Sequence, residues 1–289
     1  MFNNVDTKAA LIKSKHNQFN RLTLIIFNYE TMPYLILLLI AVIAVYLVFR
    51  KKKGPKPSVD DLKPVDYKTL LATHVNYYQK LDAAGKTRFE QLVNEFLQDI
   101  RIEGVGTEVT ALDRALIASS AVIPIFGFPD WKYKNLTNVI LYPDTFDGEF
   151  QFEGEDRNIL GMVGSGYMNG QMLLSRGALM AGFSKSAGAG NAAIHEFVHL
   201  LDKADGETDG VPEYFMHHEY ALPWLKMMHH EMHRIKEGNS DINPYALTSE
   251  AEFLAVAAEY FFEKPDQLKH KHPEIYEQLS KAFGQDLAE

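Results

Sequence analysis

The chain has 289 residues, of which 46% are hydrophobic, and this length allows one large domain or two small ones with a proper core. Residues 1–53 carry eight Lys/Arg against two Asp/Glu (+6), whereas residues 54–289 carry 21 against 36 (-15). So acidic a body argues against a nucleic-acid-binding surface. The lack of cysteine excludes a disulfide framework, a Cys-ligated zinc site and a thiol nucleophile.

The N-terminal part predicts a membrane anchor. Residues 1–31 show no clear period, and Met32 itself resembles a start, so residues 1–31 could be untranslated. Residues 32–50 are apolar up to Arg50 and would span about 27 Å as a helix, close to the hydrocarbon thickness. The basic run Arg50–Lys53 favours a cytoplasmic body, although four basic residues before the span weaken this. We therefore expect a single-pass protein of the bacterial inner membrane.

The rest of the chain reads as a linker and one body. Residues 51–66 contain prolines and predict an extended juxtamembrane linker, and residues 67–289 form the body. Periodicity and turn residues predict two helices, over 86–100 and 111–123, and three short strands, over 103–109, 138–142 and 171–175. Alternating helices and a few short strands indicate an α+β fold, mainly helical with a small sheet.

The stretch Asn191–Asp202 predicts a metal-binding helix. It places His195 and His199 four residues apart with Glu196 between them, on an otherwise apolar segment. At 3.6 residues per turn the two imidazoles share one face, and Glu196 lies beside the open position of a shared ion. Buried His and Glu are costly without partners, and a metal supplies one. We expect one Zn²⁺ ion here.

A catalytic zinc takes three protein ligands and leaves one position for water, so a third ligand is needed. Asp202 lies three residues after His199, where closing a tetrahedron would be strained, and we expect it to hydrogen-bond a ligand instead. The acidic loop 205–210 lacks the glutamate that a calcium loop needs at its twelfth position. His229 and His233 could chelate a metal, but their charged neighbours are typical of a solvent-exposed helix face, so we do not expect them to bind the ion.

Two acids on a later helix are the remaining candidates. Glu252 and Glu259 lie seven residues apart in the apolar segment 248–262, so they share one largely buried face. Glu252 also fits a capping box with Ser249, a purely structural role. Two acids on such a face suit one metal ligand and one group that hydrogen-bonds a ligand histidine.

Several separated motifs resemble one family. They are Glu108–Thr110, Tyr142–Pro143, Leu174–Ser175, His195–Asp202, Gly210–Pro212, Ile242–Ala246 and Ala251–Phe262. In this order, over about residues 67–284, they resemble the zinc-dependent peptidases of the Mlc titration factor A family. The resemblance implies a zincin-like, gluzincin-type domain with Glu252 as third ligand and Tyr245 near the metal as a transition-state stabiliser. It also implies a cytoplasmic regulatory protein as a partner. The N-terminal span departs from the soluble family members.

The expected function is a membrane-anchored zinc peptidase in which Glu196 is the general base for a zinc-activated water. An extended peptide substrate is expected to pair with the strand just ahead of the zinc helix, formed by Gln171, Met172, Leu173, Leu174 and Ser175. One alternative is a regulator-binding (titration) module with weak or vestigial hydrolysis. Another is a membrane-anchored scaffold with a structural zinc, which would need a fourth protein ligand such as Asp202.

Overall fold

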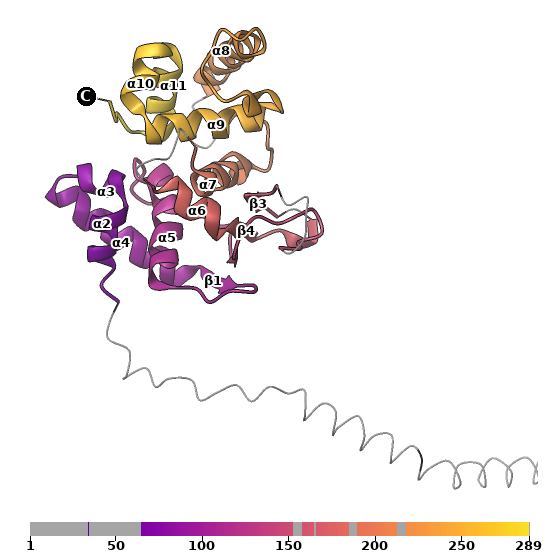
Figure 1. Cartoon of the computed structure of the whole chain (residues 1–289). Helices are drawn as coiled ribbons and strands as arrows, with labels where there is room; N and C mark the ends of the chain where they lie inside the picture. The colour runs from indigo at the N-terminus through magenta and orange to yellow at the C-terminus, as the bar shows by residue number, and fades with distance from the viewer. Residues whose placement is uncertain are drawn as a thin grey trace, which may run out of the picture. The chain divides into compact units, whose positions relative to one another are not determined.

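The computed structural model describes residues 65–152, 158–164, 166–184, 190–212 and 218–288, and Tyr34 alone before them. The chain divides into two compact units, Met1–Lys63 and Pro64–Glu289. The elements below all belong to the second unit (Figure 1).

Helices dominate this unit. In chain order the elements are α2 (Tyr67–His74), α3 (Asn76–Lys80), α4 (Ala83–Asp99), β1 (Arg101–Gly104), α5 (Ala111–Ile125), β2 (Asn138–Tyr142), β3 (Gly161–Val163), the 3-10 turn η2 (Gly166–Met168), β4 (Gln171–Ser175), α6 (Arg176–Gly182), α7 (Ala192–Asp202), η3 (Lys203–Asp205), α8 (His218–Lys236), η4 (Pro244–Leu247), α9 (Glu250–Glu263), α10 (Pro265–Lys271) and α11 (Pro273–Phe283). The expected mainly helical α+β class with a small sheet is confirmed.

Most predicted elements lie where the sequence indicated. Strands β2 and β4 have the predicted bounds, and α5 starts after Thr110, whose hydroxyl accepts from the Asp113 backbone in a capping box. Strand β1 differs, because it begins at Arg101 and ends at Gly104 rather than reaching Val109. Gly106 has a φ of 69°, so the chain turns immediately after the strand instead of extending it.

The sheet has four strands in the order β1-β2-β4-β3. Strands β1, β2 and β4 are parallel, and β3 pairs antiparallel to β4 with Met162 opposite Leu173. Strand β4 is therefore hydrogen-bonded along both sides, and β3 is an edge strand. This arrangement decides which strand can receive another peptide.

Helix α7 lies at the centre of the unit. It packs against α5, α6, α9 and β3, and Figure 1 shows α9 crossing it on the side away from the strands. Phe197 of α7 fills the core, with its ring centroid 5.7 Å from that of Phe96 and 5.1 Å from that of Tyr133. Helix α5 is buried almost all round, as expected for a helix that is apolar on every face. Packing against these four elements fixes α7 and hence its histidines.

The predicted membrane helix at residues 32–50 lies, apart from Tyr34, outside the described residues. A crossing helix needs about 18 or more apolar residues with few charges, and no helix among the described residues combines that length with that composition. The longest described helix, α8 with 19 residues, carries lysine, glutamate and histidine along its length. This finding corrects the predictions of a transmembrane helix in the fold class and of a single-pass inner-membrane localisation.

Candidate metal centre

Helix α7 brings the two motif histidines together. The side chain of Asn191 caps its start by accepting from the Ile194 backbone N–H at 3.2 Å. One helical turn separates His195 from His199, and their Nε2 atoms lie 3.0 Å apart. Their side chains are only 10% and 14% exposed. The rings are thus held on one face of a rigid, buried helix.

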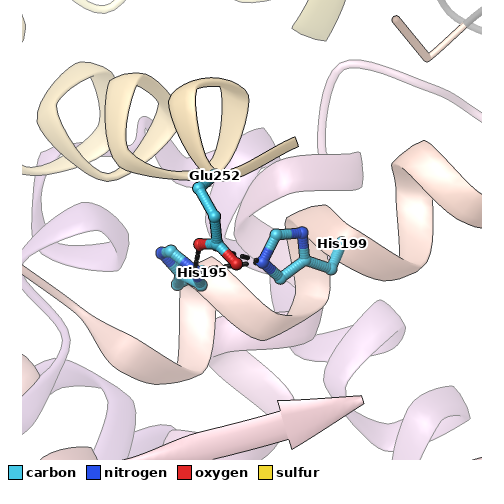
Figure 2. A group of neighbouring side chains, drawn as sticks. All are labelled: His195, His199 and Glu252. Carbon is cyan, nitrogen blue, oxygen red and sulfur yellow. Dashed lines mark hydrogen bonds and ion pairs between the residues drawn. The ribbon is translucent and has the colours of Figure 1, made fainter. Parts of the chain in front are cut away.

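Helix α9 supplies a carboxylate from the opposite side. Ser249 caps this helix by accepting from the Glu252 backbone N–H at 3.2 Å, so Glu252 lies in the first turn. Its side chain points from α9 toward the two histidines (Figure 2). Oε2 of Glu252 lies 2.9 Å from Nε2 of His195 and 3.4 Å from Nε2 of His199. Among the described residues, these three form a group whose ligand atoms all lie within 4.8 Å of one another.

Glu259 orients one of the histidines. Its Oε1 lies 2.7 Å from Nδ1 of His195, and its Oε2 accepts the Asn191 backbone N–H at 2.5 Å. Because a carboxylate accepts, Nδ1 of His195 carries a proton, and Nε2, which faces the centre of the group, is the nitrogen that would bind a metal ion. This contact matches the predicted role of Glu259 as a hydrogen-bond partner of a histidine.

Asp202 lies apart from the group. Its Oδ2 accepts the Gly210 backbone N–H at 3.0 Å, which ties the end of α7 to the following loop. Its Oδ1 and the Nδ1 of His199 are both buried without a hydrogen-bond partner. The predicted hydrogen bond from Asp202 to a histidine is therefore not formed, although both atoms that would make it remain unsatisfied.

The donor set fits a metal ion. Nε2 of His195 lies only 2.9 Å from the Glu252 carboxylate, a contact that calls for positive charge there, either a second proton on the imidazole or a cation bound between the two groups. Burial lowers the pKa of His195, but hydrogen bonds to Glu252 and Glu259 outweigh it and raise the pKa to about 10. The surroundings thus favour positive charge at this point. Two imidazoles and a carboxylate are the ligands that a divalent transition metal prefers.

An open cleft of about 530 Å³ reaches this group. It is lined by Ile159, Gly161, Met162, Val163, His195, Glu196, His199, Lys203, Thr208, Tyr245, Ser249, Ala251 and Glu252. Glu196 is only 7% exposed, and burial is the main cause that raises its pKa to about 7. Tyr245 on η4 is 53% exposed, with its ring centroid 6.0 Å from that of His195. The structure thus gathers both predicted catalytic residues beside the metal group.

The structure also separates some candidates from the site. Strand β4 is the inner neighbour of β3 and has no free side, so the prediction that it receives the substrate is wrong. His229 is 59% exposed and lies 3.3 Å from Glu250, as expected of a solvated helix face. Sequence reasoning missed the edge strand β3 and Lys203; the only signal for β3 was the glycine at position 161, in a run of closely spaced glycines.

Comparison with known proteins agrees with this geometry. Residues 48–284 match the family model described as glucose-regulated metallo-peptidase M90. An uncharacterised protein of Synechocystis sp. (strain ATCC 27184 / PCC 6803 / Kazusa) is 29% identical over 76% of this chain and 84% of its own. Mlc titration factor A of Enterobacter sp. (strain 638) is 27% identical over 81% of this chain and 90% of its own. Mlc titration factor A of Salmonella agona (strain SL483) is 27% identical over 71% of this chain and 81% of its own. The resemblance in the sequence motifs is confirmed, and this chain belongs to the M90 metallopeptidase family.

Proposed function

We propose that this protein is a zinc-dependent peptidase in which His195, His199 and Glu252 bind one zinc ion. The observation that carries the proposal is the convergence of their ligand atoms within 4.8 Å at the base of an open cleft. Two histidines and a glutamate form a typical catalytic zinc set, which leaves a position for water. A structural zinc would need a fourth protein ligand, and the described residues offer only three in this group.

The chain's own residues have distinct parts in the proposed reaction. Bound zinc would polarise the scissile carbonyl and lower the pKa of water. Glu196, whose pKa burial raises to about 7, accepts the proton of the attacking water and passes it to the leaving amine. The hydroxyl of Tyr245 donates to the oxyanion, an interaction that contributes about 3 kcal/mol in comparable sites. Glu259 keeps His195 in the tautomer that the ion requires.

The substrate is proposed to lie along β3 instead of β4. Leu160 O accepts from Ser175 N and Gly164 N donates to Gln171 O, both at 2.9 Å, so these alternate residues face β4. The backbone groups of Gly161 and Val163 point the opposite way, toward the open side. A peptide added there would be held mainly by backbone hydrogen bonds, which demand little of its side chains.

Metal content and peptide cleavage by the purified chain test the proposal together. We expect one zinc ion per chain and hydrolysis of unstructured peptides. The Glu196→Gln variant should keep the ion and lose hydrolysis, because it removes the base but no ligand. A His195→Ala variant that cleaves peptides at the original rate without zinc would contradict the proposal.

A second candidate function is the binding of a regulatory protein. Relatives that align with most of this chain are named Mlc titration factor A, a name that describes capture of a protein. In this reading the same domain holds a regulator, and hydrolysis is weak or vestigial. Full cellular function of the Glu196→Gln variant, with zinc retained, would favour capture over catalysis.

A further inference from the structure

A lysine lies at one end of the cleft. Lys203 is the first residue of η3, directly after α7, and it lines the same cleft as the metal group. Its Nζ donates to Gly164 O at 3.2 Å and to Asn169 Oδ1 at 3.3 Å. Both acceptors are uncharged, and a lysine ammonium carries three protons. Its positive charge is therefore not neutralised by the groups that hold it, and one proton remains to donate.

Lys203 differs from the other described residues of this cleft in its charge. Of the described residues that line it, Lys203 is the only lysine or arginine. Of the acids there, Glu252 is directed at the histidines and Glu196 lies against Gly161. No carboxylate of the described residues lies within ion-pair distance of Lys203, although residues 54–289 carry 36 acids against 21 basic residues. Within the part of the chain that the structure describes, the ammonium of Lys203 thus has no carboxylate partner.

The position of Lys203 relative to Glu196 indicates how far Lys203 would lie from the peptide bond that is cleaved. A Cβ on Gly161 would lie 2.6 Å from Cγ of Glu196, so the reacting bond is expected opposite Gly161. Lys203 donates to the backbone of Gly164, which lies three residues after Gly161. At about 3.4 Å per residue in a strand, Gly161 and Gly164 are about 10 Å apart. A peptide paired antiparallel to β3, the more stable arrangement, runs its N-terminal side toward Gly164.

We propose that Lys203 binds a substrate carboxylate, and that the protein selects peptides with Asp or Glu two or three residues before the cleaved bond. This inference rests on the proposed peptidase function and names a substrate class for it. A purely structural Lys203, tying η3 to the β3–β4 connection, would affect all peptides equally. A substrate-binding Lys203 changes the ratio between acidic and basic peptides.

The test uses peptides identical except for Glu, Gln or Lys at that position, and kcat/KM for each. We expect the intact chain to prefer Glu over Lys by about fivefold, since a partly exposed charged hydrogen bond contributes on the order of 1 kcal/mol. Lys203→Gln should abolish the preference and Lys203→Glu should reverse it. Lys80→Glu, on an exposed lysine of α3 outside the cleft, is the matched control and should preserve it.

Binding separates this inference from the proposed function. Fluorescence anisotropy of the same labelled peptides with the Glu196→Gln variant reports the charge preference without any hydrolysis. If the zinc-loaded intact chain binds Glu peptides best but cleaves none, the peptidase function fails and the role of Lys203 stands. Equal binding and equal cleavage of Glu and Lys peptides, or an unchanged ratio in Lys203→Glu, would overturn the role of Lys203.

Discussion

Two buried histidines in this protein each lie between two carboxylates, yet among the described residues only His195 belongs to a group that could hold a metal ion. His195 on α7 contacts Glu252 at 2.9 Å and Glu259 at 2.7 Å. His272, between α10 and α11, contacts Asp241 at 2.7 Å and lies 3.2 Å from Glu231 of α8. The two imidazoles are similarly hidden, with 10% and 3% of their side chains exposed. Burial and paired acids alone therefore do not define a metal site.

The difference lies in what neutralises the carboxylates. Around His272, Lys271 donates to Asp241 at 2.7 Å and Arg234 donates to Glu231 at 2.8 Å. Among the described residues, no lysine or arginine forms an ion pair with Glu252 or Glu259. The group around His195 instead contains a second imidazole and opens to a cleft. Unmatched negative charge and converging lone pairs distinguish a site that needs a cation from one that already has its cations.

Removing a histidine from each cluster should give the largest contrast. His199→Ala takes one of three ligands from the metal group, so we expect loss of bound zinc and of peptide hydrolysis. His272→Ala should leave the zinc content unchanged, because its carboxylates keep Lys271 and Arg234 as partners. Inductively coupled plasma mass spectrometry on both variants measures this directly. Equal loss of zinc from both variants would contradict the distinction between the metal group at His195 and the ion-pair cluster at His272.

The His272 cluster should affect stability instead. Its side chain is 3% exposed and joins α8, the loop before η4 and the start of α11. Replacing it with Gln leaves two acids without their shared imidazolium, and breaking a buried pair costs about 3 kcal/mol. Urea denaturation of the zinc-loaded variant and of the intact chain gives the difference in unfolding free energy. A His230→Gln change on the exposed face of α8 is the control and should cost almost nothing.

The pH dependence of that difference has a defined sign. Burial lowers the pKa of His272, but its contacts with Glu231 and Asp241 outweigh burial and raise the pKa above 6.5. A histidine whose pKa is raised by folding stabilises the folded state fully below about pH 6.5, its ordinary pKa. This stabilisation is lost as the pH rises through the folded-state pKa. Burial raises the pKa of Asp241, but hydrogen bonds from Lys271 and His272 hold it below the ordinary value, so its contribution is lost on acidification. We expect the stability difference between the intact chain and His272→Gln to peak between about pH 4.5 and 6.5. A difference that grows steadily above pH 6.5 would contradict this assignment.

Glu259 should have a smaller effect, confined to the metal group. Glu259→Gln keeps the size of the side chain but weakens the contact that holds the proton on Nδ1 of His195. Changing such an outer partner costs roughly ten- to a hundredfold in metal affinity. Competition with a chromogenic zinc chelator measures the change. Glu263→Gln, which alters another acid bonded to Asn191 but not to a histidine, is the matched control.

The sequence predicted the parts of this site that lie on helices. His195, Glu196 and His199 were fixed by a local motif, and Glu252 and Glu259 by a shared helical face, because 3.6-residue periodicity is visible in one segment. The choice of Glu252 as third ligand required the family resemblance. Strands β2 and β4 can be predicted because each is a short, mainly apolar run, and Pro143 follows the first of them directly.

The parts that depend on long-range contacts were missed. Strand β3 is three residues long, too short to show alternation, and only the sheet order shows that it is the edge. The cluster at His272 joins residues 31 and 41 positions apart, and nothing local marks it. Lys203 lines the cleft from the start of η3, and no motif around it in the sequence indicates this position. Local patterns identify helices and their motifs, whereas edges and ion pairs follow from packing.

The smallest expected effect concerns the close approach between Gly161 and Glu196 beside the metal group. An added Cβ at Gly161 would lie 2.6 Å from Cγ and 2.9 Å from Oε1 of Glu196, so the carboxyl must shift. Displacing a reacting group by about 1 Å lowers turnover by up to roughly a hundredfold, and side-chain adjustment should limit the loss in Gly161→Ala to about tenfold in kcat. Zinc content should stay the same, because no ligand moves. Gly148→Ala is the control, since a Cβ there meets nothing within 4 Å. Unchanged kcat in Gly161→Ala would mean that Glu196 is not held against β3 during turnover.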